Sequence, residues 1–374
     1  MKTKFFPTLL VSMFILITLT AAGQESYEFE DQYNIETTEV KSQDRTGTCW
    51  SYATTSFIET ELLRMGMATY DLSEMYFARL AYEKKADLYV KYHGRANFGQ
   101  GGQAHDVMNA IRKYGFATEN AYSALHYGTD MHMHGEMEAI LQATLDAVLK
   151  RRNRALTPVW KDAYSAILDV YLGEVPKTMN VDSRELSPKE FQEATGFNPD
   201  DYVEITSYTH QEYYEPFILE VPDNWSNDLY YNLPLDEMME VMKYSLKEGY
   251  SFVFDGDVSS PGFSHKNGVA VVAADDDADI AEGPVEEKKV DAEYRQMMFE
   301  NLTATDDHLM HITDFAYDKN DTPYYKTKNS WGTDSNDLGG YLYMSEQYMR
   351  LNTVAIMVHK DAIPGEIQEK LGLE

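Results

Sequence analysis

Cysteine is almost absent from this sequence, since Cys49 is the only one among 374 residues. A single cysteine cannot form a disulfide within the chain, so a disulfide-stapled scaffold is excluded and the fold must rely on its core. The Cys and His spacings that are typical of zinc sites are absent too. The lone thiol is therefore either a small buried side chain or a reactive group.

Basic residues are scarce relative to acidic ones. The chain has 32 Lys and Arg against 62 Asp and Glu, which gives a formal net charge of -30. Because nucleic-acid affinity comes largely from Lys and Arg, a nucleic acid is excluded as the main partner. The charge favours a soluble protein and cationic or neutral peptide partners. Apolar residues make up 43% and aromatic residues 13%, which excludes a disordered or fibrous protein.

Long apolar runs are missing except near the N-terminus. Lys2 and Lys4 precede an apolar run over 5–20, and small residues follow at 21–23. This pattern is typical of a secretory signal peptide, whereas the run is too short and interrupted to span a membrane comfortably. We expect residues 1–23 to be cleaved, leaving an extracytoplasmic (secreted or periplasmic) protein with no stable membrane anchor. An uncleaved anchor is the alternative.

Hydrophobic periodicity divides the chain into a helical part and a β part. The acidic stretch 275–287 between the β-like runs is interpreted as a solvated loop and not as a metal site. We therefore expect an α+β fold with a helical lobe at about 42–248, a β lobe at about 249–360, a short tail at 361–374 and a cleft between the lobes. Helices are predicted over 49–64, 103–114, 137–151, 159–172, 235–248 and 288–301, and strands over 250–254, 269–273, 308–315, 324–328, 340–344 and 354–359.

The start of the first predicted helix carries residues suited to nucleophilic chemistry. Cys49 opens this helix after Gly47, and the positive end of a helix dipole lowers the pKa of a thiol. Gln43 lies six residues earlier, where its amide can bind an oxyanion together with the backbone N–H of Cys49. A lone Cys with His and Asn far along the chain is a candidate catalytic nucleophile.

Three spaced motifs resemble the active-site segments of papain-like cysteine peptidases. They are Gln43-x5-Cys49-Trp50, a His308 that begins a β-like run, and the Asn-Ser-Trp-Gly segment at 329–332. The order Cys, His, Asn also matches. The resemblance implies that Cys49 is the nucleophile, His308 its base, Asn329 the residue that orients the histidine, and Gln43 part of the oxyanion hole. It implies no cofactor and no metal.

The chain is similar in particular to the bleomycin hydrolase and aminopeptidase C branch. The similar segments include 71–76, Gly101-Gly102-Gln103, 113–115 and 328–332. The branch implies a papain-like two-lobed fold, a helical lobe beside an antiparallel β-barrel-like lobe, and peptide substrates. It also implies aminopeptidase activity, substrate binding by Gly101 and Gly102, and a homo-oligomer, a hexamer by resemblance.

The chain departs from that pattern at several positions. Leu309 stands where the family has a small residue, and Asp314 stands where it has a Gly. The branch has a longer C-terminal tail in the cleft, whereas here only ten residues follow Pro364. We expect 366–371 to be helical, which would leave the cleft open to longer and N-blocked peptides. A catalytically silent papain-like binding protein at the cell surface is the alternative, and a Cys-His transferase is a third interpretation.

Two histidines compete for the role of base. Residues 308 and 311 face opposite sides of a strand, so only one can face Cys49. The His-x-Met pattern favours His308 over His311. Six other histidines are interpreted as surface or core side chains: His93, His105, His126, His132, His134 and His265.

Overall fold

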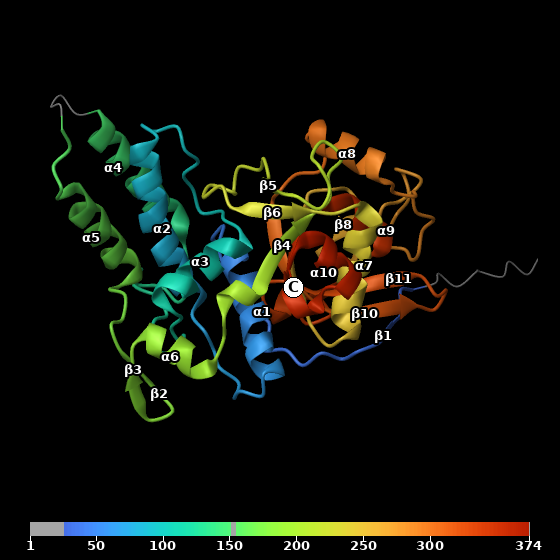
Figure 1. Cartoon of the computed structure of the whole chain (residues 1–374), viewed down its shortest axis with the longest axis horizontal. Coiled ribbons are helices and arrows are strands. Elements are labelled where there is room, and N and C mark those ends of the chain that lie inside the picture. The colour runs from blue at the N-terminus through green and yellow to red at the C-terminus, as the bar shows by residue number, and fades with distance from the viewer. Residues whose placement is uncertain (1–25, 151–154, 374) are drawn as a thin grey trace, which may run out of the picture.

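The computed structural model describes residues 26–150 and 155–373 (Figure 1). The expected signal peptide over 1–23 lies outside the described residues. Within the described ranges, no helix combines the length and the apolar character needed to cross a membrane.

Helices dominate one side of the molecule (Figure 1). One apolar cluster joins them, and helix α1 is its centre, because 13 of its 16 residues are buried. The elements on this side are α1 (Cys49–Arg64), α2 (Glu74–Lys91), α3 (Ala104–Tyr114), α4 (His134–Leu149), α5 (Trp160–Leu172), α6 (Pro188–Thr195) and the small hairpin of β2 (Met179–Val181) and β3 (Arg184–Leu186).

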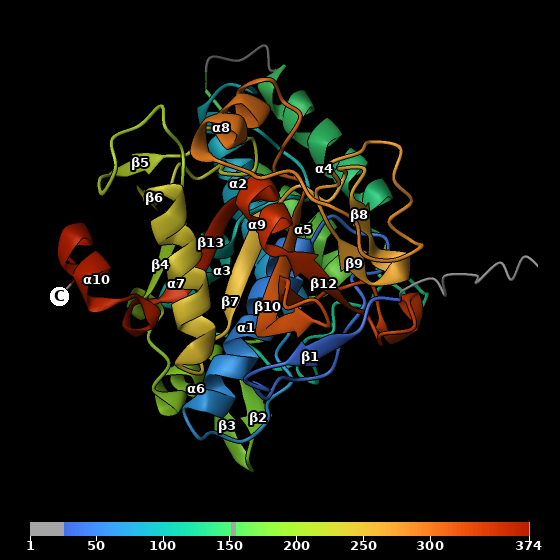
Figure 2. The ribbon, with the colours of Figure 1, turned by 90° about the vertical axis from the view of Figure 1, so that its right-hand side faces the viewer.

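A large sheet forms the other side (Figures 1 and 2). Its strands run in the order β5-β6-β4-β13-β7-β10-β11-β12-β9-β8, and β1 also pairs with β10. The pairs are antiparallel except β4 with β6 and β9 with β12. The strands are β1 (Phe29–Asp31), β4 (Tyr202–Thr206), β5 (Pro216–Ile218), β6 (Leu229–Asn232), β7 (Phe252–Gly256), β8 (Phe263–Ser264), β9 (Val269–Ala270), β10 (His308–Asp318), β11 (Pro323–Lys328), β12 (Tyr341–Ser345) and β13 (Thr353–His359).

The alternation of side chains along β10 joins the two sides. Leu309 belongs to the apolar cluster of the helices, whereas Met310 and Ile312 belong to the second large cluster, on the opposite face of the sheet. That opposite face packs against α7 (Leu235–Lys247), α9 (Glu346–Asn352) and the C-terminal α10 (Gly365–Leu371), while α8 (Ala292–Glu300) packs against α9. Helix α1 thus lies between the helical layer and the sheet, with β10 directly against it.

The α+β fold class is confirmed, but the elements divide along the chain less cleanly than predicted. The irregular stretch near 202–231 supplies strands β4, β5 and β6 of the large sheet. Helix α7 packs with the sheet, so elements before residue 249 already belong to the β side. Helix α2 was not predicted at all. The predicted helical tail is present as α10.

Candidate active site

Cys49 is the first residue of α1, where no preceding helical turn uses its backbone N–H. Its side chain is buried, with 9% of its surface exposed, and the sulfur accepts a hydrogen bond from the backbone N–H of Leu309 on β10. Burial raises the pKa of the Cys49 thiol to about 12, although the hydrogen bond from Leu309 lowers it. Three nearby carboxyls raise this pKa further: Asp306, Asp255 and Asp223. Burial therefore disfavours a thiolate that has no cationic partner.

His308 is the first residue of β10, directly before Leu309, which bonds Cys49. Its Nε2 lies 2.8 Å from Oδ1 of Asn329, at the end of the neighbouring strand β11. Because an amide oxygen only accepts, Nε2 carries the hydrogen and Nδ1 keeps a free lone pair. Burial lowers the pKa of His308 to about 4, although the hydrogen bond to Asn329 raises it. The nearby His265 lowers this pKa further. Burial therefore disfavours an imidazolium that has no anionic partner, and Nδ1 can accept a proton.

Trp331 covers the His308–Asn329 pair. Its ring centroid lies 5.1 Å from that of His308 and 4.8 Å from that of His265. His265 accepts a hydrogen bond from Nδ2 of Asn329 at 3.2 Å and contacts Ser335 through Nε2 at 2.8 Å. His265 thus fixes the rotation of the Asn329 amide. This role could not be predicted from the sequence, because no local signal marks a histidine 64 residues from its partner.

Gln43 lies against the Asn329 segment. Its backbone N–H donates to the Ser330 carbonyl at 2.9 Å, and its Oε1 accepts from the Ser330 hydroxyl at 2.6 Å. Its Nε2 donates to the Thr46 carbonyl at 2.6 Å. This bond uses one of the two hydrogens on the amide nitrogen, which leaves the second for a substrate oxygen.

Gly101 and Gly102 precede Gln103, the N-cap residue of α3, and both positions are too crowded for a side chain. A Cβ at Gly102 would lie 3.0 Å from the Trp50 ring, and one at Gly101 would lie 1.9 Å from a carboxylate oxygen of Asp223. Nζ of the buried Lys85 donates to the Gly101 carbonyl. The hydrogen bond from Lys85 thus fixes the predicted substrate-binding segment, which lies next to Trp50, the neighbour of Cys49.

His311 lies in a different part of the structure from His308. Its Nδ1 contacts the Ser56 hydroxyl at 3.0 Å, and its ring packs on Phe57. Ser56 follows Cys49 by about two helical turns, or roughly 10 Å along the helix axis. His311 therefore packs against the middle of α1, whereas His308 directly precedes Leu309, which bonds Cys49.

The two departures from the family pattern have local structural explanations. Leu309 contributes its side chain to the core beside α1 and its backbone N–H to Cys49. The Asp314 carboxylate accepts hydrogen bonds from the backbone N–H groups of Tyr33 at 2.9 Å and Asn34 at 2.6 Å. Asp314 thereby fastens the N-terminal segment to β10, at an irregularity in the strand.

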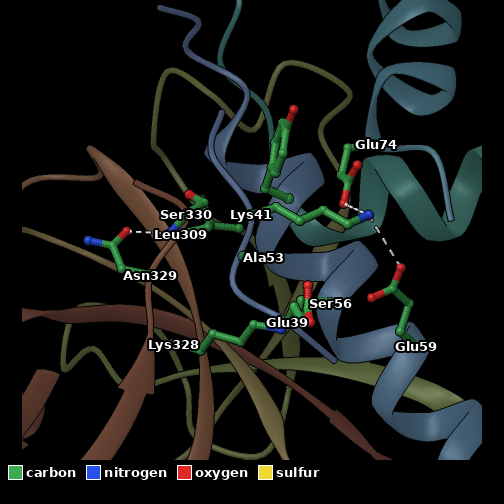
Figure 3. Close-up of a pocket in the computed structure, with 11 residues that line it drawn as sticks. Glu39, Lys41, Ala53, Ser56, Glu59, Glu74, Leu309, Lys328, Asn329 and Ser330 are labelled. Atoms are coloured by element: carbon green, nitrogen blue, oxygen red, sulfur yellow. Dashed lines mark hydrogen bonds and ion pairs between the residues drawn. The ribbon is translucent and has the colours of Figure 1, made fainter. Parts of the chain in front are cut away.

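A partly buried ion-pair network, called here the Lys41 network, joins α1 to the start of α2 (Figure 3). Nζ of Lys41 lies 2.7 Å from Glu74, 3.5 Å from Glu59 and 2.6 Å from Asp71. Burial raises the pKa of Glu74 to about 8, and Lys41 opposes that rise. Lys41 precedes Gln43 by two residues, so the network positions the segment that carries Gln43.

Family comparison agrees with this geometry. The model of the Peptidase C1-like family matches residues 77–374, and the chain therefore belongs to that family of cysteine peptidases. The matched region contains His308 and Asn329, whereas Gln43 and Cys49 precede it.

The curated relatives are aminopeptidases. The chain is 23% identical over 385 residues to Aminopeptidase G of Lactobacillus delbrueckii subsp. lactis, covering 90% of this chain and 84% of the relative. It is 22% identical to Aminopeptidase E of Lactobacillus helveticus, with the same coverage. Among solved structures, PepW from Lactobacillus rhamnosis HN001 has a TM-score of 0.74 at 18% identity, covering 92% of this chain and 85% of PepW. This last likeness establishes the papain-like fold.

Proposed function

We propose that this protein is a cysteine aminopeptidase that hydrolyses peptide bonds through a thioester at Cys49. The observation that carries the proposal is the link from α1 to β10. The lone thiol at the start of α1 bonds the residue after His308, and His308 bonds Asn329 at 2.8 Å. The aminopeptidase relatives support cleavage at the amino end of the substrate.

Acylation starts from the neutral thiol and the neutral imidazole. Nδ1 of His308 takes the thiol proton as the sulfur attacks the substrate carbonyl. The carbonyl oxygen then carries a negative charge, which the Cys49 N–H and the Gln43 amide stabilise. His308 returns the proton to the leaving nitrogen, the C–N bond breaks, and the thioester remains.

Deacylation repeats the proton transfers with water. His308 removes a proton from a water molecule as its oxygen attacks the thioester carbon. The C–S bond breaks, the sulfur recovers a proton from His308, and the carboxylic acid leaves. Asn329 holds the ring through both steps, and Trp331 keeps water from the Nε2 bond, since hydrogen bonds strengthen in a low-dielectric site.

Burial sets the order of these proton transfers. It disfavours a lone thiolate and a lone imidazolium alike, which explains the raised pKa of Cys49 and the lowered pKa of His308. Proton transfer within the pair creates both charges together and leaves the net charge unchanged. We therefore propose that thiolate forms with substrate bound, when the oxyanion donors are in use.

The C-terminal tail packs on the α7 cluster over its described residues. Ile367 and Leu371 of α10 are buried in the cluster that contains α7, and Lys370 pairs with Glu237 at 2.9 Å. Helix α10 therefore lies against α7, at the side of the sheet (Figure 2). On this basis we propose that longer and N-blocked peptides are also cleaved, though less efficiently than peptides with a free amino end.

The test is kcat/KM on matched peptides with a free or an acetylated N-terminus, with Cys49→Ala as the control. The proposal predicts cleavage of both, a preference for the free amino end, and loss of both activities in Cys49→Ala. Activity that survives Cys49→Ala would remove the thiol from the mechanism. Equal rates on both peptides would reject the aminopeptidase assignment and keep the peptidase.

The place of action and the assembly are further parts of the proposal. We propose that residues 1–23 are removed and that the enzyme acts outside the cytoplasm, from the sequence pattern alone. N-terminal sequencing of native protein tests this, and an intact Met1 contradicts it. The homo-oligomer implied by the resemblance is tested by sedimentation of the purified protein.

A further inference from the structure

A pair of acidic side chains lies beside the nucleophile and is not used by the mechanism above. Asp255 is on β7 directly opposite Leu309 of β10, whose N–H bonds Cys49. Asp306 comes two residues before His308. Both carboxyls act on the Cys49 thiol and raise its pKa. The pair therefore lies within electrostatic reach of the reacting sulfur.

Asp255 has no donor to satisfy it. It is 3% exposed, and neither carboxylate oxygen receives a hydrogen bond from a donor group in the described residues. Its contact is with the Asp306 carboxyl, and two carboxyls can bond only by sharing a proton. A buried carboxylate without a partner is costly, and no donor or positive charge on Asp255 offsets that cost here.

The pair opens toward the predicted substrate segment. Nε2 of Gln103, the residue after Gly102, donates to Asp306 at 2.9 Å. Asp306 is half-buried and Asp255 is buried, so a ligand that approaches the pair from solvent meets Asp306 first. Asp223, a third carboxyl that acts on both members of the pair, packs against Gly101. The acidic group thus lines the strip of backbone to which substrate is expected to bind.

The side chains around the pair do not neutralise it. The charged groups that shift Asp255 most are all acidic: Asp306, Glu204 and Asp223. The nearby Lys85 donates to the carbonyls of Gly99 and Gly101 and lowers the pKa of Asp223, but it is not among the charged groups that act most on Asp255. His105 bonds Glu204 at 2.6 Å. Within the described residues, no group of three or more His, Cys, Asp or Glu side chains is arranged to hold a metal ion. An organic cation remains as the fitting ligand.

Covalent geometry says where a substrate carries such a cation. In an N-terminal residue, the α-nitrogen is two bonds from the carbonyl carbon that Cys49 attacks, a distance of about 2.5 Å. An ammonium group there must lie beside the nucleophile. In an N-blocked peptide the same position holds a neutral amide. A buried acidic pair at this place therefore distinguishes the two kinds of peptide.

We propose that Asp255 and Asp306, with Asp223, bind the α-ammonium group of the substrate. The inference rests on the proposed aminopeptidase activity and names the group that confers it. When the ammonium binds, its charge replaces the shared proton, which leaves to solvent. The N–H groups of the ammonium then donate to these carboxylates, including the two oxygens of Asp255 that have no other donor.

The experiment compares three fluorogenic peptides: Leu-amide with a free amine, its N-acetyl form, and N-acetyl-Lys-Leu-amide. It measures kcat/KM for wild type, Asp255→Asn and Asp306→Asn. Both substitutions keep the size of the side chain, and thermal melting verifies the fold. We expect the ratio of free to acetylated Leu-amide to fall at least tenfold in each variant, or ~1.4 kcal/mol. Asp276→Asn, at an exposed carboxylate, is the matched charge control and keeps the wild-type ratio.

Other outcomes would overturn the ammonium site alone, or the ammonium site together with the aminopeptidase assignment. A wild-type preference for the free amine that survives both substitutions refutes this site and leaves the aminopeptidase assignment standing. A wild type without that preference refutes the aminopeptidase assignment and the ammonium site together. If N-acetyl-Lys-Leu-amide is the best substrate and only its cleavage falls in the variants, the acidic group binds a side-chain cation, and the α-ammonium proposal is wrong.

Discussion

Two buried acidic clusters near helix α1 differ in one respect. Beside the middle of the helix, Glu59 and Glu74 share the ammonium group of Lys41. Beside its first residue, Asp255 and Asp306 act on each other, and Asp255 has no donor within the described residues. The first cluster is complete within the chain, whereas the second lacks a cation. The comparison shows where the fold is self-sufficient and where it leaves a charge for a ligand to supply.

The histidines follow the same division. His311 packs against the middle of α1 and bonds Ser56, so it belongs to the structural part of the helix. His308 lies next to the residue that bonds Cys49, with Nδ1 unused. The same strand, β10, thus serves the core at one position and the proposed chemistry three residues earlier.

The largest expected effect separates these two histidines. His308→Ala should lower kcat/KM by roughly a thousandfold or more, since it removes the proton acceptor of both steps. His311→Ala should retain most of the activity and lose stability, because it empties a core position. Peptidase assays and thermal melts of both variants measure this. Loss of activity in folded His311→Ala with retention in His308→Ala would reverse the assignment.

Removing the cation from the completed cluster should destabilise the protein. Lys41→Met leaves Glu59 and Glu74 buried without their partner, which costs about 3 kcal/mol in the free energy of unfolding. Urea titration measures it. Lys288→Met is the matched control, because its pair with Asp276 is exposed and contributes little. Equal stability of the two variants would show that the Lys41 network is not needed for the fold.

The tail should matter for stability more than for specificity. Deleting 366–374 removes the buried side chains of Ile367 and Leu371, at a cost of about 3 kcal/mol or more. The ratio of kcat/KM on free to acetylated peptides should change less than tenfold, because α10 packs on the α7 cluster. A collapse of that ratio would show that the tail reaches the cleft.

A smaller effect is expected in the pH dependence of stability. Burial raises the pKa of Asp306 to about 7 and that of Asp255 well above its ordinary value. An acid whose pKa is raised in the folded state lowers the free energy of unfolding, and the full loss is present above the folded-state pKa. The loss disappears below the pKa of the unfolded chain, which is about 3.9 for Asp. Asp255→Asn should therefore melt above wild type at pH 8, and the difference should shrink toward pH 4.5. A constant difference would mean that the pair does not titrate.

The sequence predicted those parts of the site that have local patterns. The start of α1 and strands β10 and β11 follow from periodicity, and they carry Cys49, His308 and Asn329. The assignment of catalytic roles to these residues remains a prediction. Helix α2 was missed because its inner face includes polar residues such as Glu74 and Lys85, which interrupt the apolar stripe.

The parts that could not be predicted depend on register between distant segments. Asp255 and Asp306 are 51 residues apart in the sequence, and the pairing of β7 with β10 brings them together. His265 reaches Asn329 from a short turn between β8 and β9. No spacing rule connects such residues, because strand order in a large sheet depends on packing of the whole chain.

The most direct test of the account is to trap the thioester. Wild-type protein mixed with a peptide ester carrying a free amine, quenched in acid and digested, should show the acyl mass on the segment that contains Cys49. The account predicts an adduct that forms within one turnover and disappears as product accumulates. Turnover without an adduct on Cys49, or an adduct on another residue, would contradict it.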